Sequence, residues 1–274
     1  MTVTNAVETT MIWGTVSGAS MVGMVISLLL SVGLPIFLGI FIYKKTKAWV
    51  PAFFIGCGIF VGFAMILEQI CHAIVLTVTG SAIRDNIWLY AIYGGLAAAL
   101  FEECGRWIAM KFCLKKHLTR ENALMYGAGH GGIEAFLILG MSSMSNLLTA
   151  AMINGGLMEK TMTALEPAQQ EVTYHQLSVL WTTPAYQFYL APVERISAIA
   201  LQIALSILVY SAVKTGRKLQ LAAAFGLHFA VDFLTVICAS MIPTWALELG
   251  LLVVVAVICA AVYKLVYVHS AEKK

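Results

Sequence analysis

Residues 121–149 read ENALMYGAGHGGIEAFLILGMSSMSNLLT, an apolar stretch whose interior carries His130 and Glu134. At a rise of about 1.5 Å per residue, a helix of this length crosses the roughly 30 Å hydrocarbon core of a bilayer. The rest of the chain is similar, because 60% of its 274 residues are hydrophobic and only 11% are charged. In soluble domains about a quarter of all residues are charged, so the sequence predicts an all-α polytopic membrane helix bundle.

Seven apolar segments are predicted to span the membrane. They cover residues 17–43, 50–79, 87–112, 121–149, 186–213, 218–240 and 244–268. Thirteen of the 17 Lys and Arg residues follow the first, third, fifth and seventh segments, Lys273 and Lys274 among them. Only Arg84 and Lys160 lie on the opposite side, so the positive-inside rule predicts an outer N-terminus and a cytoplasmic C-terminus. The net charge of +3 is spread over short loops, which argues against a nucleic-acid partner.

We expect residues 1–274 to form a single integral membrane domain. The connection formed by residues 155–185 is too long for a simple link in a compact bundle, and Glu166-Pro167 is typical of a helix start. Two interpretations of this outer segment stay open. It is either a cap that contacts a substrate or an interfacial helix that closes the outer end of the bundle.

Three of the predicted spans carry ionisable side chains in pairs. The pairs are Glu102-Glu103-x-x-Arg106, His130-x-x-x-Glu134 and His228-x-x-x-Asp232. An ionisable group inside a bilayer costs several kcal/mol unless it is paired or hydrated, so such residues indicate function by default. Residues four apart share one face of a helix, so each histidine points the same way as its carboxylate partner.

The three motifs lie at a similar predicted depth in the membrane. His130 and His228 each lie ten residues beyond the cytoplasmic start of their span, roughly 15 Å deep, and Glu103 lies roughly 12 Å from Lys111. Glu102 and Glu103 point about 100° apart, so one can face the centre while the other pairs with Arg106. The sequence therefore predicts one hydrolytic or metal-binding centre, with an ion-pair network that merely holds the helices together as the alternative.

A second polar set lies nearer the predicted outer face. It consists of Glu68 and His72 in the second span and Glu194 and Arg195 in the fifth. We expect Glu68 to pair with Arg195, because a buried pair lowers the cost of both charges. A role for Glu194 in the central site is the alternative.

On these motifs the sequence resembles the YhfC-type intramembrane metalloproteases of bacteria, which are similar to the PrsW proteases and to the CaaX prenyl protease and Abi (CPBP) group. The resemblance covers about residues 87–240, taken as the core catalytic bundle, and its most specific stretch is Gly129-His130-Gly131-Gly132-Ile133-Glu134. Members of the wider group typically have phenylalanine at the position of His130 or asparagine at that of Asp232.

The resemblance implies peptide-bond hydrolysis by an activated water in a bacterial cytoplasmic membrane, on a membrane-embedded protein or peptide substrate. It implies Glu102 or Glu103 as the general base with His130 and His228 as partners, and Arg106 to orient a glutamate or stabilise an oxyanion. Glu134 and Asp232 complete the candidate catalytic set. A Zn²⁺ or another divalent metal would take its ligands from Glu103, His130, Glu134, His228 and Asp232, with Glu194 as a further candidate.

Two other classes of protein also place acids and histidines in the membrane. They are proton-coupled transporters and non-catalytic scaffolds or sensors. No inverted repeat is visible in the hydropathy, which argues against a transporter. A protease requires the glutamates and histidines to meet around one water or ion, whereas a transporter would spread them along a path.

Overall fold

The computed structural model describes residues 11–269, and within them every regular element is a helix. Seven of these helical segments are long and apolar enough to span a membrane, which confirms the predicted helix bundle. They are Gly18–Thr46, Pro51–Thr79, Ile87–Cys113, Arg120–Asn154, Ala185–Thr215, Lys218–Ala239 and Thr244–Tyr267. Residues 1–10 and the C-terminal Lys273 and Lys274 lie outside the described residues.

Four of the spans are built from more than one helical segment. The second joins α2 (Pro51–Phe60), a π-helical stretch (Val61–Glu68) and α3 (Gln69–Thr79), and the fourth joins α5 (Arg120–Ala135), a π-helical turn (Phe136–Gly140) and α6 (Met141–Asn154). The third joins α4 (Ile87–Ile108) to a π-helical turn (Ala109–Cys113), and the short 3₁₀ turn Lys115–His117 follows it. The last span is α11 (Thr244–Val262), extended by Tyr263–Tyr267. The single-helix spans are α1 (Gly18–Thr46), α9 (Ala185–Thr215) and α10 (Lys218–Ala239).

The ends of the helices follow from local chemistry. Asn86 caps α4, accepting from the backbone N–H of Trp88 at 3.0 Å and of Leu89 at 3.2 Å. Thr119 caps α5 in the same way, through the N–H of Asn122 at 3.2 Å. At the other end of a span, α9 stops at Gly216, whose positive φ of 73° is readily adopted only by glycine.

α9 lies at the centre of the bundle. In its most apolar stretch 72% of the residues are buried, against at most 33% in any other span. α5 packs against it on one side and against α2 on the other. The contact between α5 and α2 requires glycine, because a Cβ on Gly129 of α5 would lie 1.9 Å from the carbonyl oxygen of Phe53 on α2.

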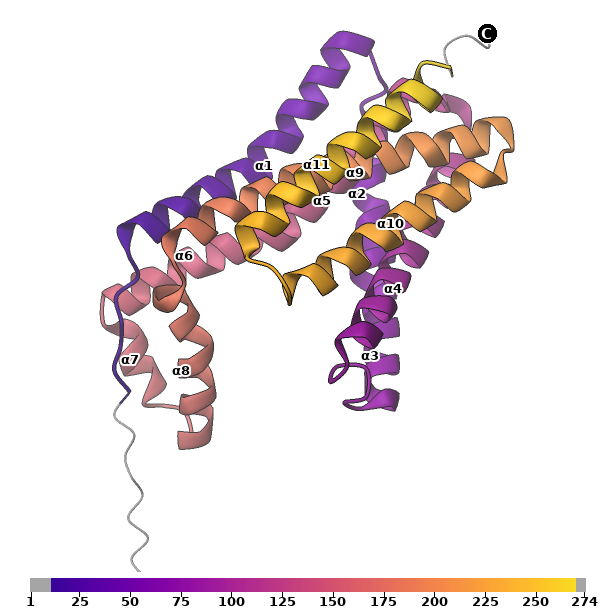
Figure 1. Ribbon diagram of the computed structural model, residues 1–274. Coiled ribbons are helices and arrows are strands. Elements are labelled where there is room, and N and C mark those ends of the chain that lie inside the picture. The colour runs from indigo at the N-terminus through magenta and orange to yellow at the C-terminus, as the bar shows by residue number, and fades with distance from the viewer. Residues whose placement is uncertain (1–10, 270–274) are drawn as a thin grey trace, which may run out of the picture.

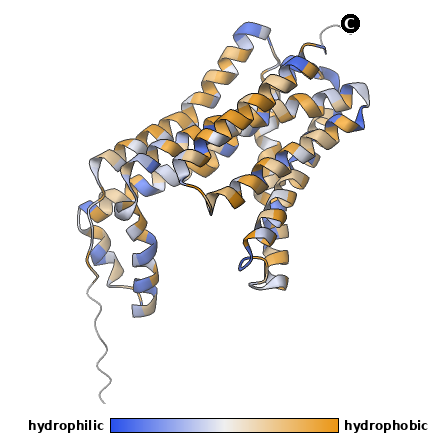
Figure 2. Ribbon diagram, viewed as in Figure 1, coloured by the Kyte–Doolittle hydropathy of each residue, from blue (hydrophilic) through white to orange (hydrophobic). Residues whose placement is uncertain are grey.

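Figure 1 shows how the helices are arranged. α1, α5, α6, α9 and α11 run roughly side by side, whereas α2–α3 and α4 cross them at a steep angle. α10 packs on α4 and α9 and so bridges the two groups. The spanning helices are largely hydrophobic along their length (Figure 2), and many of their large apolar side chains are exposed, as in helices that face lipid. Which end faces the cytoplasm stays a prediction.

The outer connection contains α7 (Leu157–Met162) and α8 (Pro167–Thr182). α8 begins at Pro167, as the sequence predicts. Its apolar side chains Leu177, Leu180 and Trp181 pack on the segment that leads into α1, where Trp13 lies with its ring centroid 5.8 Å from that of Trp181. Its use as a cap stays a prediction.

Candidate active site

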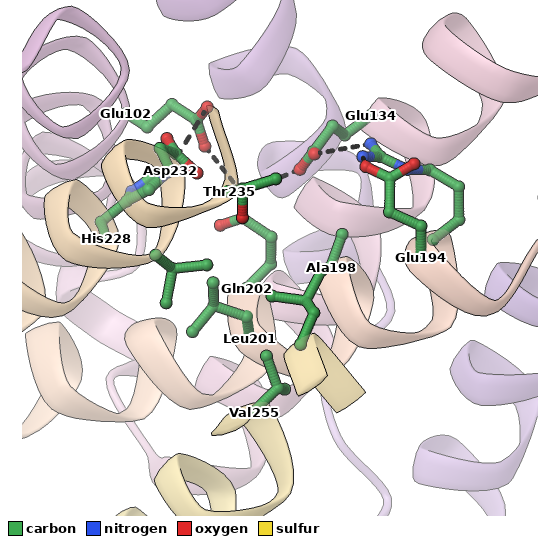
Figure 3. A pocket seen from close by; sticks show the side chains of 13 residues that line it. Glu102, Glu134, Glu194, Ala198, Leu201, Gln202, His228, Asp232, Thr235 and Val255 are labelled. Atoms are coloured by element: carbon green, nitrogen blue, oxygen red, sulfur yellow. Dashed lines mark hydrogen bonds and ion pairs between the residues drawn. The ribbon is translucent and has the colours of Figure 1, made fainter. Parts of the chain in front are cut away.

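Four helices bring the polar side chains of the motifs together. α4 supplies Glu102, Glu103 and Arg106, α5 supplies His130 and Glu134, and α10 supplies His228 and Asp232. α9, at the centre, completes the cluster with Gln202. Part of the cluster lines a cavity of about 110 Å³, which has room for water (Figure 3). The lining residues from the predicted set are Glu102, Glu134, Glu194, His228 and Asp232.

Glu102 lies at the centre of the network. Its Oε2 is 2.9 Å from His130 Nε2 and accepts a 2.8 Å hydrogen bond from Gln202 Nε2. Its Oε1 lies 4.0 Å from His228 Nε2, too far for a direct hydrogen bond. One oxygen is therefore held in place by donors while the other is turned toward His228.

His228 is oriented from behind by the second glutamate. Its Nδ1 is 2.8 Å from Oε1 of Glu103, whose side chain is fully buried. With Nδ1–H donating to this carboxylate, Nε2 is left facing the cavity, 3.5 Å from Asp232 Oδ2. Glu103 itself does not line the cavity, so it acts on the imidazole rather than on the cavity contents.

Arg106 is fully buried and also lies behind the cavity. Its Nε is 3.2 Å from Glu103 Oε2, and its Nη1 donates to the backbone oxygen of Gln202 at 2.7 Å and to Ser206 Oγ at 2.8 Å. Its Nη2 donates to Gln202 Oε1 and lies 3.8 Å from Glu102 Oε2. The guanidinium therefore neutralises and orients the glutamate pair.

His130 also lies away from the cavity, although its motif was the most specific one. Its ring is fully buried, with Nε2 bonded to Glu102 and 3.4 Å from Arg106 Nη2, and with Nδ1 3.4 Å from the Tyr126 hydroxyl. Both ring nitrogens are thus directed at protein groups. His130 is placed to position Glu102, not to contact the cavity contents.

Gln202 is the functional residue that sequence reasoning missed. Its amide nitrogen donates to Glu102 Oε2 and to Glu134 Oε2, each at 2.8 Å, while its oxygen accepts from Arg106. Gln202 is uncharged and belongs to no motif. The available signal was its position seven residues after Arg195, which puts both on the same face of a predicted span.

The expected pairing of Glu68 with Arg195 is wrong. Arg195 Nη1 donates to Glu134 Oε1 at 3.1 Å, and its Nη2 donates to Glu194. Glu68 instead lies 3.3 Å from His72 Nε2 in its own span, and His72 Nδ1 is 2.7 Å from the Tyr93 hydroxyl. Arg195 pairs with Glu134 because that buried carboxylate, on the adjacent helix α5, needs a compensating positive charge.

The metal question depends on donor chemistry and donor positions. Within residues 11–269, no three His, Cys, Asp or Glu side chains stand in the arrangement of a metal site. Around the cavity-facing His228 Nε2, however, lie Asp232 Oδ2 at 3.5 Å and Glu102 Oε1 at 4.0 Å. One imidazole and two carboxylates are donors that zinc accepts, and a carboxylate behind the imidazole is the usual support of a zinc-binding histidine. The donor set therefore fits a zinc-like ion in its chemistry.

Comparison with known proteins agrees with these motifs. The chain is 43% identical over 204 residues to the uncharacterized membrane protein YhfC of Bacillus subtilis (strain 168), a region that covers 71% of this chain and 76% of that protein. No solved structure matches the chain. The family profile described as YhfC intramembrane metalloprotease matches residues 30–259, which include every described residue that lines the cavity. The chain therefore belongs to the YhfC intramembrane metalloprotease family.

Proposed function

We propose that this protein is an endopeptidase of the bacterial cytoplasmic membrane that hydrolyses peptide bonds in membrane-embedded protein or peptide substrates. The observation that carries the proposal is the cavity of about 110 Å³ in which Glu102, His228 and Asp232 meet among apolar helices. Charged groups are kept inside a membrane domain only where they are used or paired. Here Glu102, His228 and Asp232 converge on one cavity, as hydrolysis requires.

Glu102 is the group that activates the water in this proposal. The 4.0 Å between its Oε1 and His228 Nε2 suits a single water that contacts both. Glu102 takes a proton from that water as the water oxygen attacks the carbonyl carbon of the substrate. The same proton then passes to the amide nitrogen as the peptide bond breaks, so the carboxylate is regenerated.

His228 stabilises the charge that develops on the substrate. Its Nε2 faces the same space as Glu102 Oε1, where an imidazolium N–H would donate to the carbonyl oxygen as it becomes an oxyanion. The buried Glu103 carboxylate, 2.8 Å from Nδ1, favours the charged ring and fixes its orientation. Glu103, His130, Arg106 and Gln202 are positioning residues, because they act through Glu102 or His228.

In a metal-bound form of the site, a zinc-like ion would be held by Glu102, His228 and Asp232, and it would supply the positive charge in place of the imidazolium, because an Nε2 that ligates a metal carries no proton. When bound, such an ion lowers the pKa of its water to about 7 and polarises a carbonyl group. Glu134 is a weaker candidate ligand, because both of its oxygens are already bonded, to Arg195 and to Gln202.

The first experiment measures cleavage in proteoliposomes. The purified protein is co-reconstituted with a pool of synthetic single-span peptides, and the fragments are identified by mass spectrometry. We expect Glu102→Gln and His228→Ala to abolish cleavage, while Glu68→Gln, a buried glutamate outside the cavity, retains it. Full cleavage by Glu102→Gln would disprove the assignment.

Metal content gives a readout that does not depend on turnover. We expect about one zinc-like ion per purified chain, lost in His228→Ala and Asp232→Asn. His72→Ala is the control, because His72 lies outside the cavity. A metal content that is unchanged in His228→Ala would overturn the ligand assignment while leaving the role of Glu102 to the cleavage assay.

A further inference from the structure

A second cavity adjoins the candidate active site. It has a volume of about 510 Å³ and lies between α10 and α11. Among the described residues that line it, Thr235 carries the one hydroxyl, and the other side chains are apolar or, at Cys238, a thiol. We call it the α10–α11 groove.

The groove arises from the way these two helices pack. α10 packs mainly against α4, whereas α11 packs mainly against α9, so the two successive helices make little contact with each other. Figure 1 shows them joined by a short turn and packed on different partners. Large apolar side chains on the groove remain exposed, with Leu234 at 52% and Val257 at 63%. In a membrane the groove therefore opens sideways to lipid.

The groove and the polar cavity lie next to each other. Val231 and Thr235 of α10 and Leu251 of α11 line both of them. The lining runs from Leu227 to Cys238 on α10 and from Ala246 to Ile258 on α11. The shared residues lie midway along both stretches. Glu102 and His228 thus lie behind the middle of the groove, beyond these three side chains, and not beyond one of its ends.

We propose that the α10–α11 groove binds an apolar membrane-spanning segment of the protein substrate and admits it sideways to Glu102 and His228. This inference rests on the proposed peptidase function and names its substrate class. The first and last residues of α10 that line the groove, Leu227 and Cys238, are eleven positions apart, so its length is roughly 17 Å, about half of the hydrocarbon core. A stretch of substrate chain of that length is held inside the bilayer with its scissile bond beside the cavity.

The central position of the opening decides between two apolar occupants. A polypeptide that is cut internally has chain on both sides of the scissile bond, and the groove extends to both sides of the shared residues. A lipid-modified peptide has its hydrocarbon on one side only and would need an opening at the end of the groove. The hydroxyl of Thr235, at the junction, is placed to hydrogen-bond a substrate backbone that has unwound there.

Binding is tested without turnover, in the Glu102→Gln background. A photoreactive p-benzoyl-phenylalanine is placed at Val254 in the groove, or at Leu29 on α1 as a control that is also exposed, at 66%. The probe is a biotinylated, Lys-flanked Leu/Ala peptide of membrane-spanning length, reconstituted with the protein. We expect crosslinking at Val254 to exceed that at Leu29 at least fivefold.

A matched pair of glycines tests whether binding in the groove is the cause of the crosslink at Val254. Gly250 lines the groove, and neither Gly250 nor Gly33 on α1 has an atom within 4 Å of an added Cβ. Gly250→Leu should fill the groove and remove the Val254 crosslink without disturbing the fold, whereas Gly33→Leu should leave it. In the active protein, Gly250→Leu should also reduce cleavage of single-span peptides at least tenfold.

The outcomes separate this inference from the proposed function. Equal crosslinking at Val254 and Leu29, or a crosslink at Val254 only to a farnesylated soluble peptide, would overturn the inference. Cleavage of single-span peptides that Gly250→Leu leaves unchanged would also overturn it, with the peptidase function intact. A strong Val254 crosslink in a protein that cleaves nothing supports the groove as a binding site and counts against the peptidase.

Discussion

The two adjacent glutamates of α4 occupy different environments. Glu102 lines the cavity, whereas Glu103 is fully buried behind it, against His228 and Arg106. Successive helical residues point about 100° apart, so a pair of identical side chains can serve two purposes at one depth. In the proposed mechanism Glu102 contacts the water, and Glu103 sets the orientation of the imidazole that faces it.

Glu103→Gln should lower kcat roughly 10²-fold or more and leave KM nearly unchanged. An amide can present either its oxygen or its NH₂ group to His228 Nδ1, so the ring loses its fixed orientation and the support for its charge. Initial rates over a range of substrate concentrations, normalised to the folded protein, give both constants.

Glu68→Gln is the matched control for that substitution. Glu68 is also buried, at 7% exposure, but it pairs with His72 and does not line the cavity. If Glu103→Gln lost only folded protein, with kcat per folded molecule unchanged, its role would be structural and the orienting role would be wrong.

The residue types of the site could be predicted, but their partners could not. The His-x-x-x-Asp and Glu-Glu spacings fix which side chains share a helix face, because that depends only on helical geometry. Whether Arg195 meets Glu68 or Glu134 depends on how three helices cross, which no local pattern encodes. Gln202 escaped for a related reason, since an uncharged residue inside a span becomes informative only when its neighbours are known.

At the scale of the helices, the glycines of α5 determine how closely the bundle can pack. A Cβ on Gly56 of α2 would lie 2.2 Å from the backbone carbonyl oxygen of Tyr126, and one on Gly129 of α5 would lie 1.9 Å from the backbone carbonyl oxygen of Phe53. Backbones that approach so closely hold α5 in register with α2. His130, which adjoins Gly129, is thereby fixed against Glu102.

Gly129→Ala should destabilise the protein by about 2 kcal/mol or more, because the added methyl group meets a backbone atom that cannot rotate away. Gly58→Ala, on the neighbouring helix α2, is the control, since nothing lies within 4 Å of its added Cβ. That change should be neutral or stabilising by up to roughly 1 kcal/mol. Thermal denaturation in detergent compares the two, and equal midpoints would contradict the close packing of α5 and α2.

The limits of the helices show what hydropathy misses. The fourth span was expected to end at residue 149, whereas α6 continues to Asn154. Residues 150–153 are apolar, and Asn154, which ends the helix, is held by Val16, whose N–H donates to its Oδ1 at 2.8 Å. That contact joins segments 138 residues apart and has no trace in the local sequence.

At the scale of the whole molecule, the basic residues predict which way the bundle is oriented in the membrane and how deep the site lies. Arg84 is the one basic residue in the loop between α3 and α4, whereas the turn after α4 carries two, Lys115 and Lys116. The positive-inside rule places the second of these in the cytoplasm. Glu103 and His228 then lie roughly 12–15 Å from the cytoplasmic surface, near the middle of the bilayer.

An epitope tag inserted after Arg84 should be cleaved by protease added to intact spheroplasts, whereas a tag inserted after Lys116 should resist until the membrane is opened. Both positions are exposed and lie outside the membrane-spanning helices, Lys116 in the short 3₁₀ turn Lys115–His117, so neither insertion interrupts a span. A fluorescent protein fused behind Lys274 should fluoresce, because it would fold in the cytoplasm. The Lys116 tag also serves as the control for intact spheroplasts, since its cleavage before lysis together with that of the Arg84 tag would invalidate the result.

The reverse pattern, with the Lys116 tag cleaved from outside and the Arg84 tag protected, would show that the topology is the opposite of the predicted one. The α10–α11 groove would still open to lipid, but the loops at its two ends would exchange sides, and the soluble fragments released by cleavage would leave on the opposite sides of the membrane.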